Sequence, residues 1–489
     1  MIQSVLIANR GEIACRIIAT LRRMRITSIA VYHFDDRRAP HVELADAAVE
    51  LTAEIPSAAY LDVPQLLAAA TQSGAQAIHP GYGFLAENSG FARAVTDAGL
   101  IFVGPSAEVI EIMGDKIRAT DFAISAGIPV APRIINDDIA SLLDEVDTLG
   151  YPVLIKAAAG GGGKGMKVAD NREQLRERIA VARSEAQRYF LDGRVYVERL
   201  IERPRHIEVQ IFGDGIGNAI HLFERECSIQ RRFQKIIEES PAPNLDPAVR
   251  DQICAAAVKL TSAAKYLNAG TVEFFLDQDN AFYFLEMNTR LQVEHPVTEQ
   301  VTGFDLVEEQ IHIADSGLLR LKQADVVQRG HAIECRICAE QPDDDFRPAT
   351  GTVRLLRLPE GDEIRIDNGV NEGQEIGAAF DSMLAKLIVH SPTREQAIAT
   401  CISALRDYVL LGVAVNIEFL GRIVRHPVFQ AGQLHTGFIP EHIDELRAVP
   451  LEQCDLDAVL LAAALATDSF KRDVYEIPDL HAAIGHWRN

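Results

Sequence analysis

The sequence predicts a protein of several α/β and α+β domains, beginning with a doubly wound α/β domain. Three observations lead to this fold class. The chain has 489 residues, which is long for one hydrophobic core and suits about two to four domains. Strand and helix signals alternate up to about residue 104, as in a doubly wound sheet. From about Met113 antiparallel patterns and a glycine-rich loop take over, so we expect an α+β region there and a β-rich region after about residue 335.

The first region is defined by its short strands and by one strongly patterned helix. Residues 4–8 form an apolar run, and within 12–24 the side chains of Ile13, Ile17 and Leu21 share one helical face. The other elements expected here are strands at 28–34, 48–51, 75–80 and 100–104 and a helix at 64–74. The turn 9-NRGE-12 lacks the GxGxxG pattern, so dinucleotide binding is not expected there.

The later regions are read from alternating strand patterns separated by helical segments. Residues 151–169 read as a strand, a glycine loop and a second strand, and residues 194–213 alternate like an antiparallel pair. The remaining expected elements are helices at 115–126, 171–190, 246–266 and 393–407 and strands at 217–223, 270–276, 281–288, 351–356, 363–370 and 384–390. The central strands are expected to form an antiparallel set around the helix at 246–266.

Composition excludes several classes of partner. The formal net charge is −22 and no basic run offsets it, so nucleic acid is not expected to bind. The longest apolar run, 458–466, is far short of the about 20 residues of a membrane span. No cleavable or transit segment precedes the first strand, and we expect a cytoplasmic protein without a membrane partner.

The cysteine pattern favours reduced thiols. Seven cysteines are scattered along the chain. An odd number in a long chain favours free, reduced thiols, as in cytosolic proteins. The segment 335-CRIC-338 has metal-ligand spacing, but it lacks a second CxxC or a nearby Cys/His pair. Buried strand cysteines are therefore favoured over zinc.

A glycine loop indicates phosphate binding. Gly160 to Gly163 and Gly165 allow close approach of backbone N–H groups to an anion. The loop is not a Walker motif, because Lys164 is followed by Gly165. Strand signals on both sides indicate a hairpin tip. Lys156 in the preceding strand favours a lid over phosphates rather than a plain surface hairpin.

A row of polar residues follows the strand at 281–288. In an extended chain alternate residues share one side, which would align Glu286, Asn288, Arg290, Gln292 and Glu294. A solvent-facing strand is the ordinary explanation. The apolar start of this strand, the ending 295-HP-296 and a second acid, Glu273, within 272-VEFF-275 argue for burial instead. Two buried acids near phosphates suggest Mg²⁺, with an arginine for an anionic co-substrate and a terminal base.

At this point the sequence resembles the biotin carboxylase family of the ATP-grasp superfamily. The resemblance runs over roughly residues 1–447 and rests on these segments in family order: 5-VLIANRGEIA-14, 79-HPGYGFLAEN-88, 113-MGDK-116, 156-KAAAGGGGKGMKV-168, 204-PRHIEVQ-210, 224-ERECSIQRRFQKIIEE-239, 286-EMNTRLQVEHPVTE-299, 331-HAIECRI-337, 346-FRPATG-351 and 380-FDSMLAKL-387.

The resemblance implies the domain limits and the roles of single residues. The domains would be an N-terminal α/β domain (1–114), an ATP-grasp domain (115–335) with its lid at about 130–203, a C-terminal β-rich domain (336–447) and a helical tail (448–489) that leads toward a linker. ATP would be bound by Lys116, Lys156, Gly161, Gly162, Gly163, Met166, Glu198, His206 and Gln230. Metal ligands would be Glu273, Glu286 and Asn288. Bicarbonate would meet Lys235, Arg290, Gln292 and Val293, with Glu294 as the base, and biotin would meet Arg336 and Tyr82.

The resemblance also implies the reaction and the partners. Glu294 would deprotonate bicarbonate, which attacks the γ-phosphate of ATP in the presence of Mg²⁺ or Mn²⁺ to give carboxyphosphate. This would release CO₂ and phosphate, and the phosphate would take a proton from biotin. Biotin would be held on a carrier protein or domain that this sequence lacks, since no Met-Lys-Met acceptor occurs. A carboxyltransferase and a second copy of the chain are the other partners implied.

Three positions depart from the family pattern. Phe233 stands where the family usually has a polar residue near the ribose, Ala159 replaces a glycine, and Cys338 stands where Asn is common. Phe233 would weaken ATP binding by one hydrogen bond. Several other conspicuous residues are assigned to structure: the acids Glu238, Glu239 and Asp343 to Asp345 as solvated or capping groups, and His295 and His331 as packing groups.

Two alternatives stay open on the sequence alone. One is another ATP-grasp ligase that passes a carboxyphosphate or acyl phosphate to an amine, which would turn over without biotin. The other is a regulatory nucleotide-binding subunit without turnover, for which Phe233 is the one supporting feature.

Overall fold

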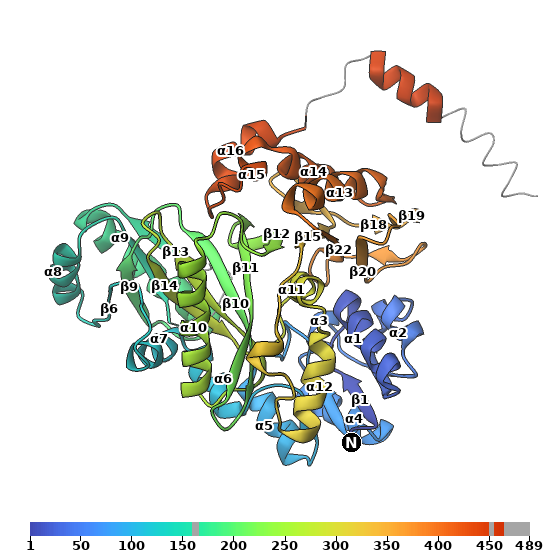
Figure 1. Cartoon of the computed structure of the whole chain (residues 1–489), viewed down its shortest axis with the longest axis horizontal. Helices are drawn as coiled ribbons and strands as arrows, with labels where there is room; N and C mark the ends of the chain where they lie inside the picture. Colours follow the sequence, from blue (N-terminus) through green and yellow to red (C-terminus); the bar gives the residue numbers. More distant parts are fainter. Residues whose placement is uncertain (159–165, 449–453, 464–489) are drawn as a thin grey trace, which may run out of the picture. The chain divides into compact units, whose positions relative to one another are not determined.

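The computed structural model describes residues 1–158, 166–448 and 454–463 of the chain (Figure 1). The chain divides into two compact units, Met1–Leu446 and Arg447–Asn489. Within the second unit, the described residues 454–463 are helical, in agreement with a helix expected in the tail. Gly161, Gly162 and Gly163 lie outside the described residues.

The first unit opens with a five-stranded parallel sheet in the order β3-β2-β1-β4-β5. Its elements are β1 (Ser4–Ile7), α1 (Gly11–Met24), β2 (Thr27–His33), α2 (Pro40–Leu44), β3 (Ala47–Leu51), α3 (Pro56–Ala59), α4 (Val63–Ser73), β4 (Ala77–His79), α5 (Ser89–Asp97) and β5 (Ile101–Phe102). Ile13, Ile17 and Leu21 of α1 are buried, which confirms the predicted apolar face. The doubly wound sheet is confirmed as well.

A four-stranded antiparallel sheet follows, in the order β6-β9-β7-β8. The elements of this part are α6 (Ala107–Gly114), α7 (Lys116–Ser125), β6 (Arg133–Ile134), α8 (Ile139–Leu149), β7 (Val153–Ala157), β8 (Lys167–Ala169), α9 (Arg172–Phe190) and β9 (Val195–Arg199). The two strands expected within 151–169 are confirmed as β7 and β8, which pair antiparallel. The glycine loop between them, Gly160 to Gly163 and Gly165, lies outside the described residues.

The expected antiparallel pair at 194–213 is wrong. The two strands exist, but β9 pairs with β6 and β7, whereas β10 (Arg205–Asp214) pairs with β11 and β13 in another sheet. Between them, Arg203 has a left-handed backbone with φ 46°. Alternation indicates two strands but not whether they pair, because pairing depends on this connection.

The largest sheet has eight strands in the order β14-β13-β10-β11-β12-β15-β22-β20. The elements that build and cover it are β11 (Ala219–Arg231), β12 (Gln234–Ser240), α10 (Pro247–Ala263), β13 (Leu267–Leu276), β14 (Phe282–Asn288), α11 (His295–Thr302), α12 (Leu306–Ser316), β15 (His331–Cys338), β20 (Ile364–Asn368) and β22 (Met383–Ser391). In Figure 1, α10 lies along the sheet beside β10 and β11, and Ile253 and Leu260 share one core with Ile207 and Val209. The predicted strand set around this helix is confirmed.

The last part of the first unit adds short strand pairs and four helices. These are β16 (Glu340–Gln341), β17 (Arg347–Pro348), β18 (Gly351–Thr352), β19 (Leu355–Arg357), β21 (Glu375–Ile376), α13 (Arg394–Asp407), β23 (Val409–Leu411), α14 (Ile417–Arg425), α15 (Pro427–Gln430) and α16 (Phe438–Leu446). The strand expected at 351–356 is thus two short strands in different sheets. The eight-stranded sheet continues across residue 335, and the domain limits implied by the resemblance stay a prediction.

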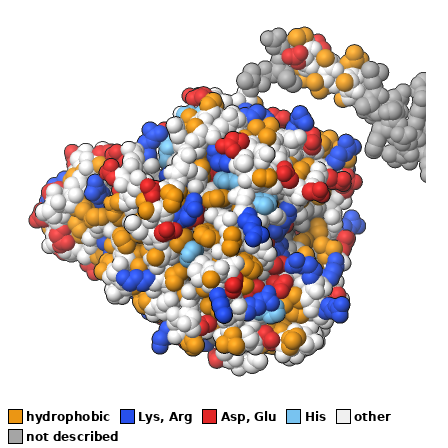
Figure 2. Space-filling model, in the orientation of Figure 1, with side chains coloured by type: hydrophobic (Ala, Val, Ile, Leu, Met, Phe, Trp, Pro, Cys, Tyr) orange, Lys and Arg blue, Asp and Glu red, His pale blue; other side chains and the backbone are white. Residues whose placement is uncertain are grey.

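The surface and the helices add two further observations. On the face seen in Figure 2, acidic and basic side chains are interspersed. Among the described residues, no helix is long and apolar enough to cross a membrane.

Candidate active site

A cavity of about 520 Å³ lies between the four-stranded and the eight-stranded sheets. Its lining includes sixteen residues from the predicted set, which reach it from eight strands, one helix and four loops or turns: Tyr82, Lys116, Lys156, Met166, Glu198, His206, Gln230, Lys235, Glu273, Glu286, Asn288, Arg290, Gln292, Val293, Arg336 and, at one departure from the family pattern, Phe233. The predicted residues therefore converge on one place. Glu294 stands directly behind this lining and is fully buried.

Three acids face one another across neighbouring strands. Glu208 of β10 is in register with Glu273 of β13, which is in register with Glu286 of β14. Glu273 Oε1 accepts hydrogen bonds from Lys235 Nζ at 2.8 Å, from Asn288 Nδ2 at 2.8 Å and from Gln292 Nε2 at 3.1 Å. Burial would raise the pKa of Glu273, but the interactions with Lys235 and His206 together outweigh it and hold the pKa below its usual range.

Lys235 joins three buried carboxylates. Its Nζ donates to Glu208 Oε2, to Glu273 Oε1 at 2.8 Å and to Glu294 Oε1 at 2.7 Å. Burial would lower the pKa of this lysine, yet the three acids raise it well above the usual value. The side chain is therefore a fixed positive charge in the floor of the cavity, as a site for an anion needs.

Glu294 is held from both sides. Its Oε1 accepts from Lys235, and its Oε2 accepts from Arg336 Nη2 at 2.8 Å. Burial opposes ionisation, but the nearby cations lower the pKa of Glu294 well below its usual range. Glu294 is thus ionised and able to accept a proton once a ligand competes for its cations.

The polar row is extended only as far as Asn288. The strand β14 ends there, Arg290 lies at a bend, and Glu294 occupies the turn before α11. The expectation of one continuous extended face is therefore wrong for its second half. The bend aims Arg290 back along the row, so that its guanidinium donates to Asn288 Oδ1 at 3.0 Å and to Gln292 Oε1 at 2.9 Å.

Arg290 and Arg336 are fixed by acids that the sequence analysis did not assign to the site. Arg290 Nε donates to Glu87 Oε2 at 2.8 Å, and Arg336 Nε donates to Glu238 Oε1 at 2.6 Å. Glu238 is fully buried, so its expected solvated or capping role is wrong. Each guanidinium is held in one orientation beside the cavity.

The neighbouring acid Glu239 is also buried, which corrects the same expectation. It accepts from Arg394, and its Oε2 lies 2.6 Å from His331 Nε2. His295 Nδ1 lies 2.7 Å from the carbonyl oxygen of Gln292. The packing roles expected for these two histidines are confirmed. Asp343 to Asp345 are exposed, as expected.

The opposite wall comes from the four-stranded sheet and α7. Lys156 of β7 and Glu198 of β9 form an ion pair, and Lys116 Nζ lies 3.8 Å from Glu286 Oε2. Met166 precedes β8, just after the residues that include Gly161 to Gly163. Two lysines on this wall leave positive charge facing the cavity, which suits phosphates.

His206 and Gln230 form one hydrogen-bonded unit. The amide of Gln230 donates to His206 Nδ1 at 2.7 Å and to the carbonyl oxygen of Cys227 at 2.8 Å. Because Nδ1 accepts, the proton belongs on Nε2, which lies 2.8 Å from Glu273 Oε2. The ring is therefore fixed between Gln230 and Glu273.

The oxygen atoms of Glu273, Glu286 and Asn288 fit a hard divalent cation. All three side chains line the cavity from adjacent strands, and Glu286 is partly exposed to it. Carboxylate and amide oxygens are the ligands that Mg²⁺ prefers. The donors now bonded to Glu273 come from Lys235, Asn288 and Gln292, and a cation would replace part of them.

Phe233 lies in a tight turn between β11 and β12. Arg232 and Phe233 have φ values of 49° and 67°, and they separate the paired residues Arg231 and Gln234. Phe233 is 58% exposed and lines the cavity. A two-residue turn with both φ angles positive suits a β-hairpin, but such angles are uncommon for a bulky aromatic residue.

Sequence reasoning missed Glu208 and Arg225, which hold the cavity floor from below. Arg225 is completely buried and donates from Nη1 to Gln210 Oε1 at 2.8 Å and to Thr298 Oγ1 at 2.9 Å, as well as to Glu208. A signal was available in 204-PRHIEVQ-210, where polar residues alternate with apolar ones as they do in 286–294.

The cysteines Cys335 and Cys338 are buried in β15, as expected.

Comparisons with known proteins show the family of the chain. Three family models match the chain: the biotin carboxylase N-terminal domain at residues 1–110, the ATP-binding domain of the carbamoyl-phosphate synthase L chain at 115–322, and the biotin carboxylase C-terminal domain at 334–441. The biotin carboxylase of Halalkalibacterium halodurans is 47% identical over 91% of this chain and 98% of its own.

A longer relative and a solved structure extend the comparison. The mitochondrial methylcrotonoyl-CoA carboxylase subunit α of Dictyostelium discoideum is 46% identical over 94% of this chain, which spans 66% of that protein. The biotin carboxylase domain dimer of Hydrogenobacter thermophilus 2-oxoglutarate carboxylase, solved with MgADP, ADP and bicarbonate, is 42% identical with a TM-score of 0.89, covering 92% of this chain and 100% of that one.

Proposed function

The chain belongs to the biotin carboxylase family, and on this premise we propose that it uses ATP and bicarbonate to carboxylate biotin. One observation carries the proposal. Glu294 is an ionised, fully buried carboxylate bonded to Lys235 and Arg336 at the floor of a cavity whose opposite wall presents Lys116 and Lys156. A base, an anion site and a phosphate site therefore face one cavity.

Bicarbonate binds beside Lys235 and Arg290 in this proposal. Both cations are oriented before the ligand arrives, which lowers the cost of binding a small anion. Because bicarbonate competes with Glu294 for Lys235, its arrival weakens the ion pair that depresses the pKa of Glu294. The carboxylate then accepts the bicarbonate proton. Gln292 and the backbone of Val293 complete the site.

ATP binds along the opposite wall. Lys116 and Lys156 hold its phosphates, and Met166, Glu198, His206 and Gln230 surround the nucleoside. Glu273, Glu286 and Asn288 would hold Mg²⁺ or Mn²⁺, which neutralises phosphate charge. The role of Gly161 to Gly163 as a lid over the phosphates is carried by the family resemblance, because these residues lie outside the described part of the chain.

The second half of the reaction takes place at Arg336. Deprotonated bicarbonate attacks the γ-phosphorus and displaces ADP, and the carboxyphosphate so formed breaks into CO₂ and phosphate. Phosphate takes the proton from the ureido nitrogen of biotin. Arg336, fixed by Glu238 and Glu294, stabilises the enolate oxygen while the nitrogen attacks CO₂. Tyr82 lines the same cavity.

The partners follow from the same proposal. Biotin arrives on a carrier protein or domain, and a carboxyltransferase consumes the carboxybiotin, so the chain performs the first half-reaction of an acyl-CoA carboxylase. The chain spans 62% to 66% of the methylcrotonoyl-CoA carboxylase α-subunits that it matches, and the activity of such a whole protein belongs to this proposal. A homodimer is proposed as well.

The test measures phosphate release from MgATP and bicarbonate, with and without biotin. We expect strong stimulation by biotin, and we expect Glu294→Gln to lower the stimulated rate by about 10²- to 10⁴-fold, as for loss of a positioned base. Glu360→Gln, at an exposed loop position, is the control and should keep the wild-type rate. ATP cleavage indifferent to biotin would support another ATP-grasp ligase, and ATP binding without cleavage would support a regulatory subunit.

A further inference from the structure

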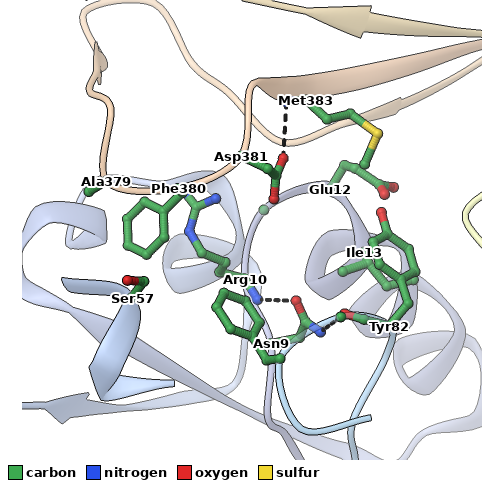
Figure 3. A pocket seen from close by; sticks show the side chains of 13 residues that line it. Asn9, Arg10, Glu12, Ile13, Ser57, Tyr82, Ala379, Phe380, Asp381 and Met383 are labelled. Carbon is green, nitrogen blue, oxygen red and sulfur yellow. Dashed lines mark hydrogen bonds between the residues drawn. The ribbon is translucent and has the colours of Figure 1, made fainter. Parts of the chain in front are cut away.

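A second cavity, of about 260 Å³, lies at the carboxyl ends of β1 and β4 (Figure 3). In the order β3-β2-β1-β4-β5, the sequence order reverses between β1 and β4. Open α/β sheets bind ligands in the crevice at such a reversal. The residues that line it come from the turns after these two strands, from the start of α1, from α3, and from the loop before β22 with the first residue of that strand: Asn9 to Ile13, Ser57, Tyr82 to Phe84, Ala379 to Asp381 and Met383.

The second cavity adjoins the central one. Tyr82, Asp381 and Met383 line both. Tyr82 therefore stands at the junction, and Arg336 lines the central cavity only. A ligand with its reacting group at Arg336 can extend into the second cavity without leaving the protein surface.

The lining disfavours a phosphate or another anion. The guanidinium of Arg10 is already used: it donates twice to Asp36, at 2.6 Å each, and lies 3.9 Å from the ring centre of Phe380. The amide of Asn9 donates to the carbonyl oxygens of Pro80 and Tyr82. Two acids, Glu12 and Asp381, also line the cavity and offer an anion no cation.

The size and the apolar side chains favour a slender, neutral chain. Drug-sized ligands occupy pockets of about 300–1,000 Å³, and this cavity is smaller. Ile13, Phe84, Phe380 and Met383 offer apolar contact. Among the described residues, the buried hydroxyl of Tyr82 has no hydrogen-bond partner, so one donor is available to a carbonyl group.

We propose that the second cavity receives the linear arm that links biotin to a lysine of its carrier, while the biotin ring passes Tyr82 and reaches Arg336. The arm is an aliphatic chain with one amide, which matches a small, largely apolar cavity where the buried Tyr82 hydroxyl can donate to the amide carbonyl. This inference rests on the proposed function. It names the route by which a carrier presents biotin.

The experiment narrows the cavity at its outer side. In Figure 3, Ser57 and Ala379 stand on the side opposite Tyr82 and Ile13, and neither lines the central cavity. Ser57→Phe should raise the KM for biotinyl-lysine about tenfold, the scale of an overpacked site, and should leave the KM values for free biotin and ATP within about twofold. Free biotin is shorter, so its chain ends before the narrowed part.

Two further variants keep the result interpretable. Ser57→Ala leaves the space open and should match wild type with both substrates. Ala379→Phe narrows the cavity from an exposed loop, and should repeat the selective effect if Ser57→Phe fails to fold. The proposed route for the arm is overturned if these variants raise the KM for free biotin as much as the KM for biotinyl-lysine. It is also overturned if neither Ser57→Phe nor Ala379→Phe changes the KM for biotinyl-lysine. Wild-type protein without any biotin-dependent turnover would instead remove the proposed function and, with it, this inference.

Discussion

The two walls of the central cavity hold their charged residues differently. The buried wall, defined here as Glu208, Lys235, Glu273, Glu294 and Arg336, consists of groups that each bond to at least two others of opposite charge or to amides. The four-stranded wall, defined as Lys156, Met166 and Glu198, contains one ion pair. The first wall is arranged by its own charges, and the second leaves more of its bonding to a ligand.

The difference between the walls determines whether a substitution affects folding stability or ligand binding. Burying ions costs several kcal/mol each, and only their mutual attraction offsets the cost. Removing one ion from the buried wall therefore affects folding as well as chemistry. On the four-stranded wall, and in the helices that cover its sheet, charged groups are more exposed or singly paired, so a change should appear in ligand binding first.

The largest effect is expected from Arg225→Met, beneath the buried wall. Without Arg225, the fully buried Glu208 depends on Lys235, which already serves Glu273 and Glu294. We expect a loss of about 3–5 kcal/mol in the free energy of unfolding, as for other buried pairs that lose one partner. Urea unfolding followed by circular dichroism measures this change.

Arg172→Met is the matched control from the four-stranded part. Arg172 pairs with Asp144 at 2.7 Å and with Asp147, and these side chains are 40%, 74% and 41% exposed. Surface pairs contribute little to stability, so the urea midpoint should not move. Equal shifts for the two arginine variants would contradict the distinction between the walls.

A second, smaller effect concerns Glu12, an acid at the edge of the buried network. It is 4% exposed, and Lys386 Nζ lies 3.1 Å from its Oε2 while donating to the carbonyl oxygen of Val293. Burial, only partly opposed by Lys386, raises the pKa of Glu12 to about 7. The folded state thus binds the proton more tightly than the unfolded state.

Because the pKa of Glu12 is raised in the folded state, folding stability falls as the pH rises. Stability from protonated Glu12 is complete below the unfolded value of about 4.5 and is lost as the pH rises through about 7. Relative to Glu12→Gln, wild type should lose up to about 3 kcal/mol of unfolding free energy between pH 4.5 and pH 8. Denaturant titrations at several pH values measure the difference between the two proteins, and a difference that does not change with pH would refute the prediction.

Residues at and beside the buried wall show how much of the site could be predicted from the sequence. Period-two polarity around an apolar strand predicted Glu286 and Asn288 correctly as cavity residues, and the second acid inside 272-VEFF-275 predicted Glu273. The bend at Arg290 was not predictable from alternation, because a strand end depends on what packs beyond it. The family resemblance, rather than spacing, identified Lys235 and Arg336.

What the sequence could not provide was the partner of each charge. Glu238 and Glu239 are adjacent acids of the kind that usually stay in water, and their partners Arg336 and Arg394 lie 98 and 155 positions later in the chain. Only the pairing of β12 with β15, and of β15 with β22, brings such residues together. Burial of polar residues is therefore harder to predict than burial of apolar ones.

The smallest effect is expected at Phe233, where a substitution should change ligand binding without disturbing the ion pairs of either wall. It faces the cavity from an exposed turn and belongs to neither wall's ion pairs. Phe233→His should add one hydrogen bond to the nucleotide, about 1 kcal/mol or about a fivefold lower KM for ATP. Phe233→Leu keeps an apolar side chain and should leave that KM unchanged.

Histidine also tolerates the positive φ better than phenylalanine, but this gain appears in the unfolding midpoint and not in ATP affinity. If the histidine and leucine variants bind ATP equally, the aromatic residue is not the missing polar contact, and nucleotide affinity on this side depends on Lys156 and Glu198 instead.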